Sequence, residues 1–296
     1  MSICSVSVTI IVCIVSQVTV TITFSDTQDG ICPTLIPCFC QEDHSISCVY
    51  QRLMELPDFL EFNQVWKELD LSQNFLLVLH SHGFVHVKVT RLRLERNMIR
   101  HIEKGSFIGL SMLESLDLSH NALRYIPAGI FQPLAKLHTL TIQFNDLGSL
   151  EERSMVGLSQ LYELDLTGNS FSKIPRESLC NLSNMKKLTL RHNHLRKLGP
   201  YAFYGLSLDY LDIGANKAPM VIDSDAFCGL DPQVISSEPG VIDWTGLETL
   251  RLDHNGLTTL PPCLIQRMWT LSSLDISNQI THYTVTVLYY YRVIMV

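Results

Sequence analysis

The chain has 296 residues, of which 46% are hydrophobic, and this composition excludes a generally disordered protein. Its 22 Lys and Arg and 29 Asp and Glu give a formal net charge of −7, without any block of basic residues. This charge pattern provides no basic surface that would attract a phosphate backbone, so the sequence predicts no nucleic-acid partner.

The first 25 residues predict an export signal. Residues 5–24 are apolar or rich in threonine, and the chain turns polar from Ser25 onward. This pattern is typical of a secretory signal peptide over residues 1–25. Because no Lys or Arg precedes the apolar stretch and no clear small-residue cleavage site follows it, an uncleaved membrane anchor is the alternative.

Residues 26–62 contain four closely spaced cysteines, Cys32, Cys38, Cys40 and Cys48. Cysteines clustered behind an export signal indicate a cap that disulfides hold together in an oxidising compartment. A zinc site is the competing interpretation. Zinc ligands usually come as cysteine pairs separated by roughly two to four residues, and these four cysteines lack that spacing.

Residues 63–280 repeat with a nearly fixed period. Asparagines at positions 74, 97, 121, 145, 169, 193 and 216 recur every 23 or 24 residues, and Asn255 follows after 39. Each ends a frame Leu-x-x-Leu-x-Leu-x-x-Asn, as in Leu113 to Asn121, or an apolar variant of it, and a bulky residue such as Phe131 often stands ten positions later. The alternating leucines predict one short strand per repeat, and only stacked repeats can bury its apolar side. We expect the asparagine amide to bond backbone groups of its own and the adjacent repeat.

This frame, with a later Phe-x-x-Leu as in Phe107 to Leu110, resembles the extracellular leucine-rich-repeat family from residue 66 to about 280. The resemblance implies an α/β solenoid of horseshoe shape, with a concave parallel sheet and an irregular or short helical convex side. The cysteine segment resembles the N-terminal cap of that family, which implies the disulfides Cys32–Cys40 and Cys38–Cys48.

The pattern breaks twice. About fifteen extra residues near 231–246 include Trp244, and they must leave the solenoid as a loop, which is either a binding loop or an inert insertion. A ninth repeat begins at Leu271, but its asparagine, Asn278, arrives one residue early. Residues 281–296 form an atypical tail without a cysteine cap, so we expect a truncated C-terminus that leaves the last strand edge open.

Three further cysteines are scattered along the repeats. Cys180 and Cys228 lie two repeats apart, which is too far for a disulfide, so Cys180 is expected to be free and buried. Cys228 and Cys263 lie in adjacent repeats and form the alternative pair. Asn181 begins the sequon Asn-Leu-Ser, on the side away from the strands, and is the expected glycosylation site.

Motifs for catalysis are missing from the sequence. It contains no Gly-rich phosphate loop, no His-Glu-x-x-His helix and no Gly-x-Ser-x-Gly elbow, so it predicts neither an enzyme nor a cofactor. His80, His82 and His86 are a candidate metal site if they share one face of a strand, and a solvated linker is the alternative. The recurring Leu-Asp-Leu is ordinary in the family that the chain resembles, so its aspartates are assigned no metal.

The residues between the leucines are expected to form one continuous surface on the sheet. Aromatic, histidine and arginine residues gather there, which is the composition of an interface centre. The alternative for Phe144 is that it merely packs on neighbouring side chains. The predicted partner-binding residues are centred on Phe144 and Tyr162 and also include His120, Gln143, Arg191, His192, Tyr210 and, in the insertion, Trp244.

These features favour a protein that binds another macromolecule. The first expectation is the ligand-recognition ectodomain of a receptor, resembling Toll-like, hormone-receptor-like or lamprey-type repeat receptors. The alternative is a secreted adhesion or extracellular-matrix protein of the same fold. The expected partner is an extracellular protein ligand, a co-receptor or a second copy of the chain, with membrane contact only through a missing or uncleaved anchor. An exported enzyme is a third class, which repeat arrays disfavour because they rarely form clefts.

Overall fold

The computed structural model describes residues 38–41, 43–59, 64–217, 219–228, 230, 246–258, 260, 270–279 and 294–295. The predicted signal peptide, Cys32, the insertion with Trp244, Cys263 and most of the tail lie outside the described residues. Among the described residues, no helix has the length and apolar character needed to cross a bilayer.

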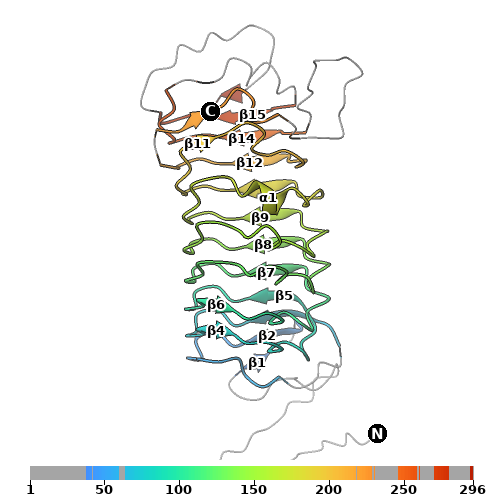
Figure 1. Cartoon of the computed structure of the whole chain (residues 1–296). Helices are drawn as coiled ribbons and strands as arrows, with labels where there is room; N and C mark the ends of the chain where they lie inside the picture. Colours follow the sequence, from blue (N-terminus) through green and yellow to red (C-terminus); the bar gives the residue numbers. More distant parts are fainter. Residues whose placement is uncertain are drawn as a thin grey trace, which may run out of the picture.

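One long sheet runs through the stacked repeats (Figure 1). The cap strands β1 and β2 are antiparallel, and every later neighbour pairs in parallel, with central leucines such as Leu116, Leu140 and Leu164 in register. The twelve strands in spatial order are β1 (Phe39–Cys40), β2 (Ser45–Ser47), β3 (Trp66–Asp70), β5 (Val89–Arg93), β7 (Ser115–Asp117), β8 (Thr139–Thr141), β9 (Glu163–Asp165), β10 (Lys187–Thr189), β12 (Tyr210–Asp212), β14 (Thr249–Arg251), β15 (Ser273–Asp275) and β16 (Ile294–Met295).

The rest of each repeat is irregular. Within the described residues the only helix is α1 (Arg176–Leu179), which has four residues. Two short parallel pairs lie outside the main sheet, β4 (Val78–Leu79) with β6 (His101–Ile102) and β11 (Lys197–Leu198) with β13 (Val221–Ile222). The side of the solenoid opposite the sheet was expected to be irregular or short-helical, and it is mainly irregular. The predicted solenoid with a parallel sheet is confirmed.

The core lies between the sheet and the irregular side. The strand leucines are fully buried, and so are the bulky residues that follow each strand, among them Phe84, Phe107 and Phe131. Their rings stack from repeat to repeat, with centroids 6.5 Å apart for Phe84 and Phe107 and 5.8 Å apart for Phe107 and Phe131. A single repeat exposes these groups, so stacking supplies the burial that stabilises the fold.

A ladder of asparagines ties each repeat to the one before it. Asn169 shows the arrangement: its Nδ2 donates to Leu166 O at 3.0 Å in its own repeat and to Ile142 O at 2.9 Å in the preceding one. Its Oδ1 accepts the N–H of Leu147 at 3.1 Å. The predicted role of the asparagines is confirmed, because they satisfy backbone groups that the irregular turns leave unpaired.

The last described rung of the ladder is a glutamine. Leu274 pairs with Leu250, which places Gln279 level with Asn255. Gln279 Oε1 accepts the N–H of Leu257 at 2.8 Å, and its Nε2 donates to Leu252 O at 2.9 Å. Asn278 is therefore not an early ladder residue; a longer amide side chain one position later makes the two bonds to the preceding repeat. The edge of β15, expected to be open, pairs with β16.

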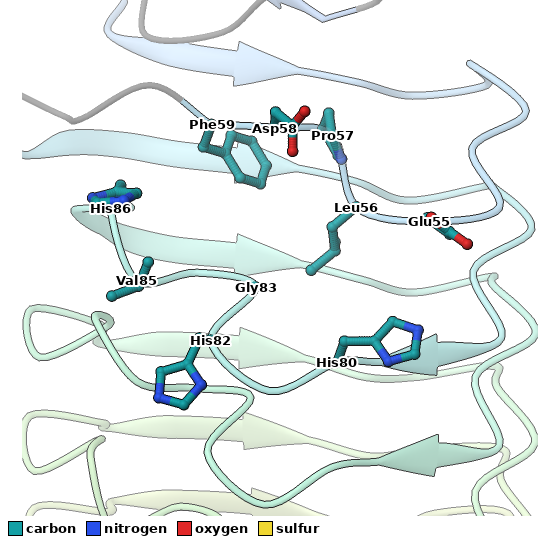
Figure 2. A pocket seen from close by; sticks show the side chains of 10 residues that line it. All are labelled: Glu55, Leu56, Pro57, Asp58, Phe59, His80, His82, Gly83, Val85 and His86. Carbon is teal, nitrogen blue, oxygen red and sulfur yellow. The ribbon is translucent and has the colours of Figure 1, made fainter.

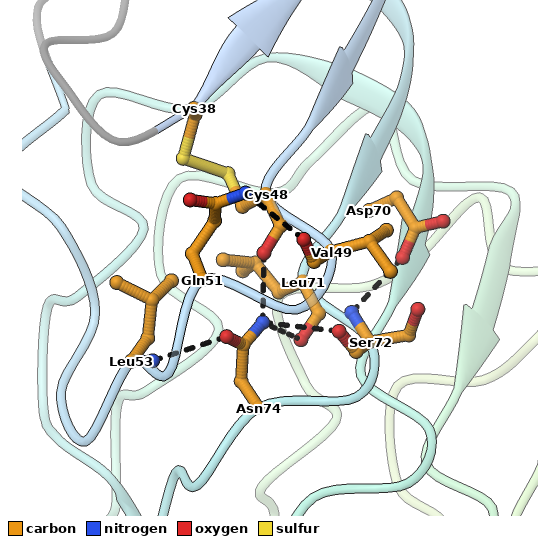
Figure 3. Close-up of a disulfide and its surroundings, with 9 residues drawn as sticks. All are labelled: Cys38, Cys48, Val49, Gln51, Leu53, Asp70, Leu71, Ser72 and Asn74. Atoms are coloured by element: carbon orange, nitrogen blue, oxygen red, sulfur yellow. Dashed lines mark hydrogen bonds between the residues drawn. A yellow bond between two sulfur atoms is a disulfide. The ribbon is translucent and has the colours of Figure 1, made fainter.

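The cap extends the sheet, because its strand β2 pairs with β3, and its disulfide lies close to the first ladder asparagine, Asn74 (Figure 3). Cys38 and Cys48 form a disulfide, as the family resemblance implied. Cys40 is also disulfide-bonded, and Cys32, its expected partner, lies outside the described residues. Asn74 Nδ2 donates to Cys48 O at 2.8 Å, so the ladder reaches into the cap.

The remaining cysteines differ in their surroundings. Cys180 is free, but it is exposed at the end of α1, so the expectation that it is buried is wrong. It lies outside the core because the buried positions around it belong to Ser178, Leu179 and Leu182. Cys228 is buried, and its pairing with Cys263 stays a prediction. Asn181 is exposed in a turn, where a glycan would meet no core.

Candidate binding face

One side of the main sheet carries the side chains that alternate with buried leucines, and we call it the sheet face. Each strand leaves the sheet at the residue just before its ladder amide. We call these residues the exit column. All have φ between 50° and 69°, a left-handed backbone conformation that residues other than Gly, Asn and Asp rarely adopt. The exit column comprises Gln73, Arg96, His120, Phe144, Gly168, His192, Ala215, His254 and Asn278.

Phe144 sits in the middle of this column between two repeats. Its ring stacks on the His120 imidazole, with centroids 4.6 Å apart and planes 14° apart. On the other side is Gly168, where an added Cβ would come within 2.5 Å of Phe144 Cδ1. Phe144 does pack on its neighbours, yet 43% of it remains exposed. The ring is therefore both held in place and presented to solvent, which suits an anchor for a partner.

Tyr162 does not lie beside Phe144. It immediately precedes β9, level with His138, because Thr139 pairs with Glu163. Phe144 comes six residues after His138, so the two aromatic residues are separated by up to about 20 Å along the strand direction. Tyr162 is 52% exposed at the start of the strands, and Phe144 lies past their end. The structure therefore gives two aromatic positions rather than the single centre that the sequence suggested.

A cluster of opposite charges occupies the sheet face towards its C-terminal end. Arg191 donates to Asp253 through both terminal nitrogens, at 2.8 and 2.6 Å, and lies 3.4 Å from Asp212. Hydrogen bonding to Arg191 holds the pKa of Asp253 well below its usual range, and the same bonds raise the pKa of Arg191. We call this group the C-terminal charged cluster: Arg191, Asp212, Arg251, Asp253 and Asp275.

Tyr210 and Gln143 are also engaged within the face. Burial, and then the neighbouring Asp212, raise the pKa of the Tyr210 hydroxyl, while Lys187 lies over its ring at 5.5 Å. Gln143 Nε2 donates to Asp165 at 2.5 Å. Of the predicted partner-binding residues, the structure thus brings together His120 with Phe144 and Arg191 with Tyr210 through Asp212. His192 is exposed in the exit column, and Trp244 lies outside the described residues.

A second charged cluster, near the cap, was missed at the sequence level. Arg93 pairs with Asp70 at 3.3 Å and with Glu95, while Arg91 approaches Glu68 at 3.5 Å. Burial raises the pKa of Glu95, and its Oε2 has no hydrogen-bond partner among the described residues. We call Glu68, Asp70, Arg91, Arg93 and Glu95 the N-terminal charged cluster. The sequence could have predicted this cluster, because acidic and basic residues occupy equivalent positions of adjacent repeats, as Asp70 and Arg93 do.

Of the three histidines that suggested a metal site, His80 directly follows β4, and His82 and His86 lie in turns. Residues 81–86 form turns rather than a strand, so the premise that they share one strand face is wrong. His80 Nδ1 lies 3.2 Å from Glu103 and His82 Nδ1 lies 2.7 Å from Ser81 Oγ. Figure 2 shows the imidazoles apart from one another around a hollow that Leu56 and Phe59 also line. The described residues contain no group of three ligands that could hold a metal ion.

Comparisons with known proteins agree with this architecture. A family model described as Leucine rich repeat matches residues 87–147 and 159–217, and a second of the same description matches residues 246–268. The chain is 34% identical to Leucine-rich repeat-containing protein 3 of Danio rerio over 34% of this chain and 38% of that protein. It is 34% identical to Tsukushi of Xenopus tropicalis over 28% and 25%, and 33% identical to the Thyrotropin receptor of Ovis aries over 28% and 10%.

A solved structure has the same fold. The crystal structure of a TLR13–ssRNA13 complex superposes with a TM-score of 0.65 at 29% sequence identity, covering 73% of this chain and 29% of that one. The matched stretches span less than two fifths of each relative. The leucine frame, the amide ladder, the family models and the solved structure agree that the chain contains leucine-rich repeats and adopts the leucine-rich-repeat fold.

Proposed function

We propose that this chain is the ligand-recognition ectodomain of an extracellular receptor and that its sheet face binds a protein. Similar proteins include two whose names call them receptors, the Thyrotropin receptor and a leucine-rich repeat-containing G-protein coupled receptor of Homo sapiens. The disulfides of the cap favour an oxidising compartment, in keeping with an extracellular place.

The observation that carries the proposal is the exposed Phe144 in the middle of the exit column, where the strands of the sheet face end. Both charged clusters are internally paired, so a partner gains little by contacting their ions. Phe144, held between His120 and Gly168, offers apolar area on a rigid backbone, and immobilising it on binding costs little additional entropy. His192 and the neighbouring polar residues would form the rim of such an interface.

Charge on the sheet face favours a protein over a nucleic acid. The TLR13 structure is a complex with single-stranded RNA. In this chain, however, Arg93, Lys187 and Arg191 are each paired with carboxylates of the same face. A phosphate backbone would have to displace those carboxylates, at a cost that a protein anchored on Phe144 avoids.

A secreted adhesion or matrix protein of the same fold is the alternative, and it would use the same face. Tsukushi, whose name does not describe it as a receptor, is among the similar proteins. The names of these proteins and the repeat models give no support to an enzyme.

The test uses the purified chain as bait in extracellular fluid, followed by purification of the captured protein and measurement of its Kd. Phe144→Ala is compared with Tyr125→Ala, a matched aromatic control that is 44% exposed outside the main sheet. We expect Phe144→Ala to weaken binding at least about tenfold, as truncation of an interface anchor does, and Tyr125→Ala to leave the Kd unchanged. Tyr162→Ala reports separately whether the far end of the strands takes part. An unchanged Kd for Phe144→Ala would refute the proposed face.

A further inference from the structure

A second surface of the molecule concentrates unpaired positive charge. A hollow of about 520 Å³ opens beside the turns that follow the strands of two adjacent repeats. Ile174, Pro200 and Ala202 are among its lining residues. We call it the basic hollow, after the four cations that line it against the single acid Glu177: Lys173, Arg176, Arg196 and Lys197.

These four cations have exposed side chains, and none has an ion pair within the described residues. On the sheet face, by contrast, Arg93 and Arg191 lie against carboxylates in the same or the next strand. In a chain with a net charge of −7, a hollow with four cations and one acid is a local reversal of sign. Unpaired cations around a concave surface raise the local concentration of anions.

The backbone beneath the cations is fixed. Lys197 lies in β11, in register with Val221 of β13, and Arg196 O accepts the Val221 N–H at 2.9 Å. Arg176 begins α1, and its guanidinium lies over the Tyr204 ring at 5.4 Å. The cations therefore project from an ordered framework, which lowers the entropy lost when an anion binds.

We propose that the basic hollow binds a sulfated polysaccharide. Guanidinium groups pair with oxyanions through two parallel N–H donors, and ammonium groups add point charges, so Arg and Lys together suit a chain with many sulfates. Proteins that bind single-stranded nucleic acid commonly stack bases on aromatic side chains, and none of the residues lining the hollow is aromatic. Tyr204 lies close to the hollow, but the Arg176 guanidinium covers one face of its ring, so that face cannot stack on a base.

The test measures binding of a heparin octasaccharide to the full chain by calorimetry at several salt concentrations. The variant Lys173→Gln/Arg196→Gln/Lys197→Gln removes three cations from the hollow. The control Lys88→Gln/Lys104→Gln/Lys136→Gln removes three exposed cations that do not line it, with the same change in net charge. We expect the hollow variant to weaken binding about tenfold or more and to flatten the salt dependence, while the control changes the Kd less than about twofold.

Three further probes decide the class of ligand. Desulfated heparin, a single-stranded RNA of equal charge and a polyglutamate peptide are each titrated against the unmodified chain. Binding that needs sulfate and exceeds that of RNA and polyglutamate supports the proposal. Equal losses in the two triple variants, equal binding of desulfated heparin, or tighter binding of RNA or polyglutamate would each overturn it. The protein-binding role of Phe144 is untouched by these outcomes.

Discussion

Asn169→Ala removes one rung of the amide ladder, and its effect can be worked out bond by bond. The N–H of Leu147 loses its acceptor, because Asn169 Oδ1 is the partner it has at 3.1 Å. Ile142 O keeps a longer bond from Asn145 at 3.4 Å, and Leu166 O keeps a bond from Asn193 at 3.0 Å. The Ile142 and Leu166 carbonyls therefore each accept from two asparagine amides, whereas the Leu147 N–H donates to Asn169 alone among the described residues.

The expected loss of stability follows from that difference. One buried donor left without an acceptor costs about 1–3 kcal/mol, and the two weakened carbonyls add roughly 1 kcal/mol between them. We therefore expect Asn169→Ala to lower the free energy of unfolding by about 2–4 kcal/mol. Asn184→Ala is the matched control: its Nδ2 donates to Ser159 O at 2.6 Å in an exposed place, so the loss should stay near 0.5 kcal/mol.

Urea unfolding followed by circular dichroism measures both variants. Repeat arrays couple mainly to their nearest neighbours, so Asn169→Ala is also expected to separate the transition into two steps around the altered repeat. If Asn169→Ala and Asn184→Ala unfold at the same urea concentration as the unmodified chain, the amide ladder does not stabilise the stack and the reasoning fails.

Two further predictions concern ion pairing and the cap. The lowered pKa of Asp253 stabilises the fold at pH values above the unfolded-state pKa of about 4, and this stability is lost as the pH falls towards the folded-state pKa. Stability against urea should therefore drop below pH 4, and Arg191→Met should make that drop smaller; an unchanged pH profile in this variant would show that the pair is not responsible. Replacing Cys38 and Cys48 by serine opens a short loop and should cost about 3 kcal/mol in thermal unfolding, while Cys180→Ser, at an exposed free thiol, changes little. Equal melting temperatures for the two would contradict a stabilising cap disulfide.

The architecture could be predicted from the sequence because each repeat contains the same pattern of leucines and a ladder amide. A leucine pair such as Leu116 and Leu118 has the period of a strand, and Asn121 then bonds backbone at a fixed offset. Local pattern and tertiary contact therefore agree in every repeat. The ninth ladder residue was not predicted because it is a glutamine, Gln279, and not an asparagine. Its side chain has an extra methylene, yet its amide bonds backbone groups of the preceding repeat.

The arrangement of the sheet face was less accessible. Phe144 and Tyr162 occupy different frame positions, and only the register of β8 with β9 shows that the strand lies between them. The contact of Phe144 with Gly168 depends on the left-handed conformation of the exit column, which a list of residue types does not reveal. Cys180 likewise looked apolar in isolation, but buried positions in its turn are taken by Leu179 and Leu182.

The two proposed sites follow from one consequence of stacking. Parallel strands place equivalent positions of neighbouring repeats about 4.8 Å apart, close enough for charged side chains to neutralise one another, as Arg93 and Asp70 do. At the basic hollow, the residue level with Lys197 in the neighbouring repeat is the apolar Val221, and Lys173 and Arg196 have no ion pair among the described residues. A ligand on the sheet face must either break pairs or use the apolar Phe144, whereas a polyanion in the basic hollow breaks none. Salt should therefore weaken binding at the hollow strongly and binding at Phe144 only slightly.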